Sequence, residues 1–129
     1  MRHCPASTMS AMAAQPRRIV VGYDGSPTGR RALDVAADLT GYGSTLTVVT
    51  VVTGNESGDT ALAEARDRLL RQHVPARYIR AVGDPADELV AAARELEADL
   101  VIVGRGNGGF DGSVLRQAGC DVLVVSDRS

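Results

Sequence analysis

Five short runs rich in Val, Ile, Leu and Thr, separated by segments with helical patterning, constrain the fold of this chain more than any other feature. The runs are Arg18–Tyr23, Thr45–Val52, Arg77–Val82, Asp99–Val103 and Asp121–Val125. Near-continuous apolar strands are typical of sheets covered on both faces, and strands that alternate with helices usually lie parallel. The pattern therefore predicts an α/β fold with an open parallel five-stranded sheet and helices on both faces.

The predicted helices carry start signals and apolar faces. Ser26 and Asp84 are each followed by proline, which suits an N-cap residue and the first helical position. In the first helix the inward face is predicted to consist of Leu33, Ala36, Ala37 and Thr40, and Gly41 is expected to end it. In a helix over Ala61–His73 we expect Leu62, Ala65, Leu69 and Leu70 to face inward. Residues 113–118 allow only a very short last helix.

The length of 129 residues fits one domain. We expect residues 1–16 to be a disordered tail and 17–129 to form the domain, with Met1, Met9 or Met12 as the start. The net charge of −2 and the aromatic content of 3% argue against a nucleic-acid partner. The chain has no apolar run of membrane-spanning length, and its first residues lack the apolar stretch of a signal peptide. These features lead us to expect a cytoplasmic protein.

The cysteines and histidines give no catalytic or metal-binding set. Cys4 and Cys120 have no metal-site spacing, and Cys120 is expected to be a small buried apolar residue. His3 and His73 are isolated in the sequence, and no Gly-Lys-Ser/Thr phosphate loop occurs. We therefore expect no enzyme.

Two loops carry the functional signal, since both follow predicted parallel strands at the edge where such sheets bind ligands. The first is Asp24-Gly25-Ser26. The second, Gly104–Ser113, has five glycines in ten residues and is followed by a predicted helix start. Glycines let backbone N–H groups approach an anion, and a helix N-terminus favours phosphate. The alternative is a flexible connection and a capped turn with no ligand.

Several segments in the same order resemble the signature segments of the universal stress protein family. They are Ile19–Pro27 (IVVGYDGSP), Leu46–Val52 (LTVVTVV), Gly83–Ala86 (GDPA), Ala98–Gly104 (ADLVIVG) and Val122–Val125 (VLVV). Together they cover nearly all of the chain from Arg17 to Val125.

The resemblance implies the strand order 3-2-1-4-5 shared with adenine nucleotide α-hydrolases, and a nucleotide site between strands one and four. It implies that Asp24 holds a ribose and that Val51 contacts adenine. It places the phosphates of ATP or AMP, with Mg²⁺ accompanying ATP, on the glycine loop; the candidate residues there are Gly104, Gly106, Gly109, Gly112 and Ser113.

The chain departs from the family pattern in the glycine loop, where several residues are missing between Gly112 and Ser113. Two functions therefore stay open: a small stress-response regulator that binds an adenine nucleotide, or a degenerate member that binds none and acts as a dimeric interaction module. A third reading is a dinucleotide-binding enzyme, from Gly104-x-Gly106-x-x-Gly109 and Asp127. No second half of such a domain follows, which argues against it.

The last predicted strand, Asp121–Val125, lies at the edge of the sheet in this order. Val122–Val125 contains no Lys, Pro or other feature that protects an exposed edge from pairing. Because universal stress proteins commonly pair this edge between two chains, we expect a homodimer through this strand.

Overall fold

The computed structural model describes residues 17–40, 43–52, 58–104 and 119–125. Several sequence predictions lie outside these residues. They concern the tail over 1–16, the helix stop at Gly41, the short last helix, and the loop residues Gly106, Gly109, Gly112 and Ser113.

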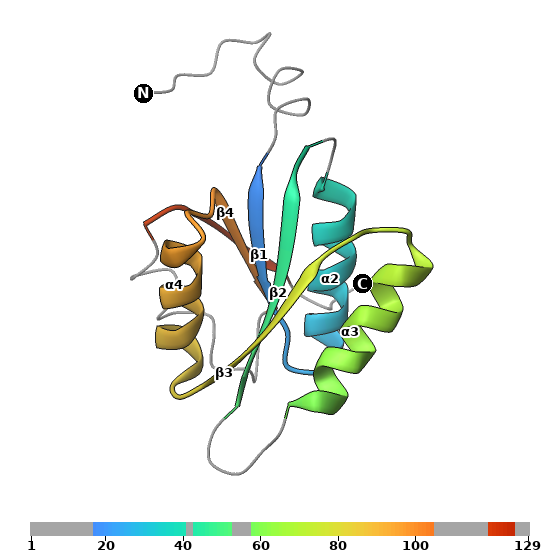
Figure 1. Cartoon of the computed structure of the whole chain (residues 1–129), viewed down its shortest axis with the longest axis horizontal. Helices are drawn as coiled ribbons and strands as arrows, with labels where there is room; N and C mark the ends of the chain where they lie inside the picture. The colour runs from blue at the N-terminus through green and yellow to red at the C-terminus, as the bar shows by residue number, and fades with distance from the viewer. Residues whose placement is uncertain (1–16, 41–42, 53–57, 105–118, 126–129) are drawn as a thin grey trace, which may run out of the picture.

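Five strands form one parallel sheet in the order β3-β2-β1-β4-β5, as predicted (Figure 1). The strands are β1 (Arg18–Gly22), β2 (Thr45–Val52), β3 (Arg77–Val82), β4 (Leu100–Gly104) and β5 (Asp121–Val125). The described helices are α2 (Pro27–Leu39), α3 (Asp59–Arg71) and α4 (Pro85–Glu95). Strands β2, β3 and β5 have the predicted bounds, β1 ends one residue early, and β4 is shifted by one residue.

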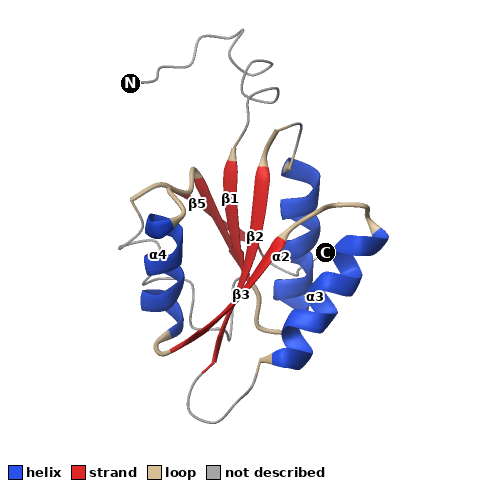
Figure 2. Cartoon of the chain, in the orientation of Figure 1, coloured by secondary structure: helices blue, strands red, loops and turns tan. Residues whose placement is uncertain are grey.

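The sheet is covered on both faces, with α2 and α3 on one side and α4 on the other (Figure 2). Successive residues of a strand point to opposite faces, so Val21 packs toward α2 while Val20 packs toward α4. Both residues are essentially inaccessible to solvent. This two-sided burial is the reason why the inner strands read as continuous apolar runs.

Two of the helices begin at the predicted caps. The Ser26 hydroxyl accepts a hydrogen bond of 3.0 Å from the Gly29 N–H, and Asp84 accepts one of 3.1 Å from the Asp87 N–H. A proline opens each of these helices. Helix α3 begins two residues before its predicted start because Gly58, at φ 74°, turns the chain without a side-chain cap. A Cβ at Gly58 would lie 2.8 Å from Val52 Cγ1, so only glycine fits this approach.

Two burial predictions are wrong. Leu70 was expected to face inward, but 59% of its surface is exposed. Helix α3 packs on the sheet through Ala65 and Leu69, one turn apart, and Leu70 lies about 100° further round the helix. Cys120 is half-buried rather than buried, because it immediately precedes the edge strand β5 and packs against the core on the α4 side only.

Candidate functional site

The candidate site lies where β1 and β4 end side by side at the centre of the sheet. These two strands are parallel neighbours, with Val21 opposite Ile102. From β1 the chain crosses to β2 on one side, whereas β4 leads to β5 on the other. Open α/β sheets form a ligand crevice at such a switch point, outside the carboxyl ends of the strands.

Asp24 follows β1 at this edge, and its side chain is exposed and held in one orientation. Its Oδ1 accepts hydrogen bonds from the Ser26 backbone N–H (3.0 Å) and from the Ser26 hydroxyl (2.5 Å). The turn between them requires Gly25 at φ 85°. Oδ2 takes no part in these two bonds. The arrangement therefore fixes a carboxylate while leaving one of its oxygens outside the turn.

Two glycines bring the start of α2 close to this carboxylate and to β4. A Cβ on Gly29 would lie 2.9 Å from Asp24 Oδ1. A Cβ on Gly104 would lie 2.8 Å from both the carbonyl carbon and the Oγ1 of Thr28. Side chains do not pack this closely, so glycine at both positions lets the β1 turn, the first turn of α2 and the end of β4 meet.

The end of β2 adjoins the same edge. Thr50, which is buried, donates its hydroxyl to the Tyr23 carbonyl at 3.0 Å, and this ties β2 to the residue before Asp24. Val51 is half-buried and packs on the α4 side of the sheet. The structure thus places Asp24, Val51 and Gly104 at or near the carboxyl ends of the parallel strands. The other predicted site residues, Gly106, Gly109, Gly112 and Ser113, lie outside the described residues.

Sequence reasoning missed Tyr23 and Gly29. The Tyr23 hydroxyl donates to Glu64 on α3 at 3.0 Å, and burial together with this carboxylate raises the pKa of Tyr23 to about 12. Tyr23 thereby stays a neutral donor that anchors the end of β1 to α3. A glycine in the first turn of a predicted helix was the available signal for Gly29, since glycine disfavours helix and usually marks close packing there.

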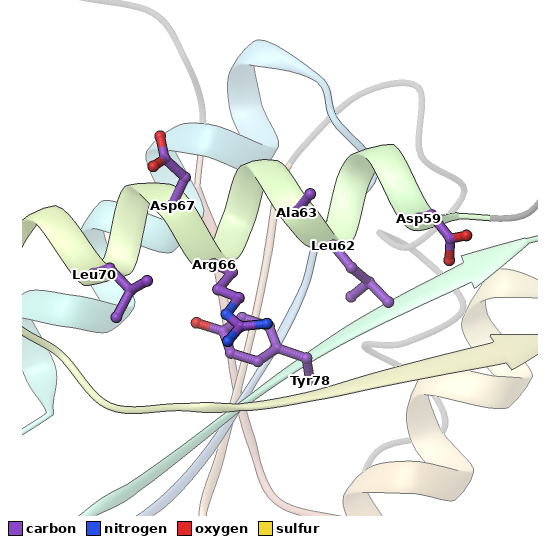
Figure 3. A pocket seen from close by; sticks show the side chains of 7 residues that line it. All are labelled: Asp59, Leu62, Ala63, Arg66, Asp67, Leu70 and Tyr78. Atoms are coloured by element: carbon purple, nitrogen blue, oxygen red, sulfur yellow. The ribbon is translucent and has the colours of Figure 1, made fainter.

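Within the described residues, no group of three or more His, Cys, Asp or Glu side chains is placed to hold a metal ion. None of the described helices is long and apolar enough to cross a membrane. A groove of about 460 Å³ lies between α3 and β3 rather than at the ends of β1 and β4 (Figure 3).

The fold is that of an α/β protein whose parallel sheet has its switch point between β1 and β4. Residues 16–126 match the universal stress protein family, and the chain belongs to this family. The resemblance seen in the sequence is thus confirmed.

Among its relatives is universal stress protein Rv1636 of Mycobacterium tuberculosis. It is 31% identical over 141 aligned positions, which cover 84% of this chain and 95% of the relative. Because 141 positions exceed the 129 residues of the whole chain, the alignment contains gaps in this chain.

Solved structures share the fold. A universal stress protein in complex with cAMP superposes with a TM-score of 0.77 at 29% identity, covering 89% of this chain and all of that one. The universal stress protein of Archaeoglobus fulgidus in complex with dAMP gives a TM-score of 0.70 at 21% identity, over 86% of this chain and 98% of that one.

Proposed function

We propose that this chain is a small cytoplasmic stress-response regulator whose domain, residues 17–129, binds an adenine nucleotide such as ATP or AMP. The observation that carries the proposal is the carboxylate of Asp24, fixed by Ser26 at the switch point beside the end of β4. A carboxylate oxygen in this place accepts hydrogen bonds from ribose hydroxyls. The relative crystallised with cAMP and the fold relative crystallised with dAMP support the choice of an adenine nucleotide.

Each part of the nucleotide has a proposed partner. Asp24 accepts from the ribose, Val51 at the end of β2 packs against adenine, and Gly104 opens the loop that holds the phosphates. Gly106, Gly109, Gly112 and Ser113 follow in that loop. Mg²⁺ is proposed only as a companion of the ATP phosphates, because the described residues offer no cluster of ligands of their own.

The proposed role is binding without turnover. His73 is exposed just beyond the end of α3, whereas Asp24 precedes α2 at the carboxyl edge of the sheet. Near Asp24 lie the hydroxyls of Ser26 and Thr28, 3.1 Å apart, and the guanidinium of Arg30, which donates to the Gly25 carbonyl at 3.0 Å. No described histidine lies beside these two hydroxyls, and the Ser26 hydroxyl is engaged in the turn, because it donates to Asp24 and accepts from the Gly29 N–H as the helix cap.

Isothermal titration of the full chain with AMP, cAMP and ATP, the last with and without Mg²⁺, tests the proposal. We expect saturable heat with adenine nucleotides and none with GMP. Absence of heat at millimolar ligand contradicts the proposal and favours the degenerate, non-binding interaction module. The observation that favours the non-binding interaction module is that this chain has gaps when aligned with its mycobacterial relative.

A further inference from the structure

The groove between α3 and β3 combines a sheet edge with an apolar wall. Strand β3 pairs with β2 only, so its outer side is an edge of the sheet. Helix α3 lines the groove with one stripe of residues at helical spacing, which are Asp59, Leu62, Ala63, Arg66, Asp67 and Leu70. Tyr78 of β3 forms the opposite wall (Figure 3).

Helix α3 and strand β3, which flank the groove, are of nearly equal length. Helix α3 has 13 residues and β3 has six. At about 1.5 Å per helical residue and about 3.3 Å per strand residue, both span about 20 Å. An extended segment lying along the β3 edge is therefore about as long as the α3 stripe.

Exposed apolar side chains lie on both elements that flank the groove. Leu70 of α3 is 59% exposed and Val82 of β3 is 52% exposed, the two largest values among the exposed large apolar residues described. Val82 lies four residues after Tyr78 and so points to the same face of the sheet. An extended chain places every second side chain on one face, which matches anchors spread along the strand rather than gathered in one pocket.

The charges of the groove select an acidic occupant. Of the three charged residues that line it, Asp67 is paired with Arg71 at 2.6 Å, and Asp59 has an interaction of its own. Arg66 forms no ion pair with any residue that the structure describes. Its guanidinium lies beside the Tyr78 ring (Figure 3). On β3, Arg80 lies on the same face as Tyr78 and has an interaction of its own, whereas Arg77 points to the opposite face of the sheet.

The same charges disfavour a second copy of this chain on the edge. Pairing β3 with β3 of another copy would align Arg77 and Arg80 of both chains along one seam, with no acidic residue on either strand. Like charges along a strand pair are destabilising.

We propose that the β3 edge and the α3 groove bind an extended acidic peptide segment of a partner protein, which adds to the sheet as a further strand. Backbone hydrogen bonds to β3 supply affinity. Apolar side chains of the peptide lie against Leu62, Leu70 and Tyr78, and a carboxylate of the peptide faces Arg66. The proposal is independent of nucleotide binding, since no residue of the candidate nucleotide site lines the groove.

The test is a titration of the ¹⁵N-labelled full chain with a capped peptide in which every second residue is alternately leucine and glutamate, with threonine between them, so that both side chains face α3; binding is followed by NMR. We expect saturable shifts confined to β3 and α3. Arg66→Glu should weaken binding by about tenfold or more, the effect of losing a charge-assisted hydrogen bond. Leu70→Asn should weaken it severalfold without loss of fold, because Leu70 is already exposed.

Two variants on α2 and a lysine peptide serve as matched controls. Arg31→Glu and Leu39→Asn change an exposed arginine and a 39% exposed leucine on α2, and should leave the affinity unchanged. The same peptide with lysine in place of glutamate should not bind. Equal binding of the lysine peptide, shifts elsewhere, or no saturation at millimolar peptide overturns the proposal. Shifts in β3 that appear on concentrating the protein alone assign the edge to a second copy and overturn it as well.

Discussion

Asp24 is the residue whose replacement tests the nucleotide site most directly. If its carboxylate accepts from the ribose, Asp24→Ala should weaken AMP binding by about 1.5–3 kcal/mol, the value of a hydrogen bond to a charged group. The measurement is isothermal titration of wild type and variant with AMP.

Two further variants separate the ribose contact from the local turn. Asp24→Asn retains a side-chain oxygen for the Ser26 N–H and so preserves the turn, but it removes the charge. It should also lose affinity. Asp38→Ala removes an exposed carboxylate from α2 and should bind AMP as wild type does. Unchanged affinity of both Asp24 variants, with the fold intact by circular dichroism, would rule out the ribose role.

For Gly104 the prediction concerns the stability of the fold rather than nucleotide binding. In Gly104→Ala the new Cβ would lie 2.8 Å from the Thr28 carbonyl carbon, so the first turn of α2 or the end of β4 must move. Overpacking of this kind costs about 1–3 kcal/mol. The free energy of unfolding in urea measures the loss. Gly119→Ala is the matched control, because nothing lies within 4 Å of a Cβ there. Equal stabilities of the two variants would contradict the close approach.

At the scale of the elements, an ion pair joins α2 to α3. Arg68 of α3 donates from Nε and Nη2 to the two carboxylate oxygens of Asp34 on α2, both at 2.8 Å. Gln72 donates to Asp34 as well, at 3.0 Å. The hydrogen bonds from Arg68 hold the pKa of Asp34 below its usual value of 3.8, against the opposing effect of burial.

This pair gives the stability of the molecule a pH dependence of known sign. A lowered pKa in the folded state means that the stabilisation is fully present above the unfolded value, near pH 4, and is lost as the pH falls through the folded value. Asp34→Asn should therefore be less stable than wild type at pH 7. Both side chains are about 40% exposed, so the difference should be below about 1 kcal/mol.

Urea unfolding from pH 7 down to pH 2 checks this expectation. The difference between wild type and Asp34→Asn should hold down to about pH 4 and shrink below it as Asp34 becomes protonated. Asp67→Asn, which breaks the more exposed Asp67–Arg71 pair within α3, is the control and should change stability less. A difference that grows toward acid pH would contradict the assignment.

The elements also show what sequence could and could not predict. Helices α2 and α4 were placed correctly because Ser26-Pro27 and Asp84-Pro85 are local signals that need no tertiary partner. The start of α3 was misplaced because Gly58 acts through its positive φ and its fit against Val52. Leu70 was wrongly expected to face inward, because helical periodicity identifies an apolar face but does not show which of its residues contact the sheet and which extend beyond it.

The candidate site divides in the same way. The positions of Asp24, after β1, and of Gly104, at the end of β4, were predictable because parallel strands end at the same side of the sheet. The contribution of Thr28 and Gly29 was not, because it depends on distances between α2, the β1 turn and β4 that arise only in the folded chain. A single sequence gives residue types and their spacings, and neither shows which residues will come close together in the folded chain.

At the scale of the whole molecule, the two sheet edges differ in chemistry. Strand β3, at one edge, contains Arg77 and Arg80 and no acidic residue. The β5 edge, Asp121–Val125, has no charge within its four apolar residues. Leu123 on β5 is 37% exposed, and Val122 and Val124 are half-buried against the α4 side. An edge strand that carries a charge only at its first residue, Asp121, and exposes a leucine at its centre is the one suited to pairing with an identical copy.

We therefore predict that the chain is a homodimer joined through β5, with the two strands antiparallel about a two-fold axis. Such an axis satisfies both edges with one self-complementary contact and covers Leu123 of each copy.

Leu123→Lys should give a monomer, because it places two like charges close to the axis in a seam that excludes water. Leu39→Lys, at a leucine of nearly equal exposure (39%) on α2, should remain dimeric. Light scattering at micromolar concentration measures the mass of each. A monomeric wild type, or a dimer that tolerates Leu123→Lys, would show that β5 is not the interface; in the second case the β3 edge becomes the surface to test, since it is the other unpaired edge of the sheet.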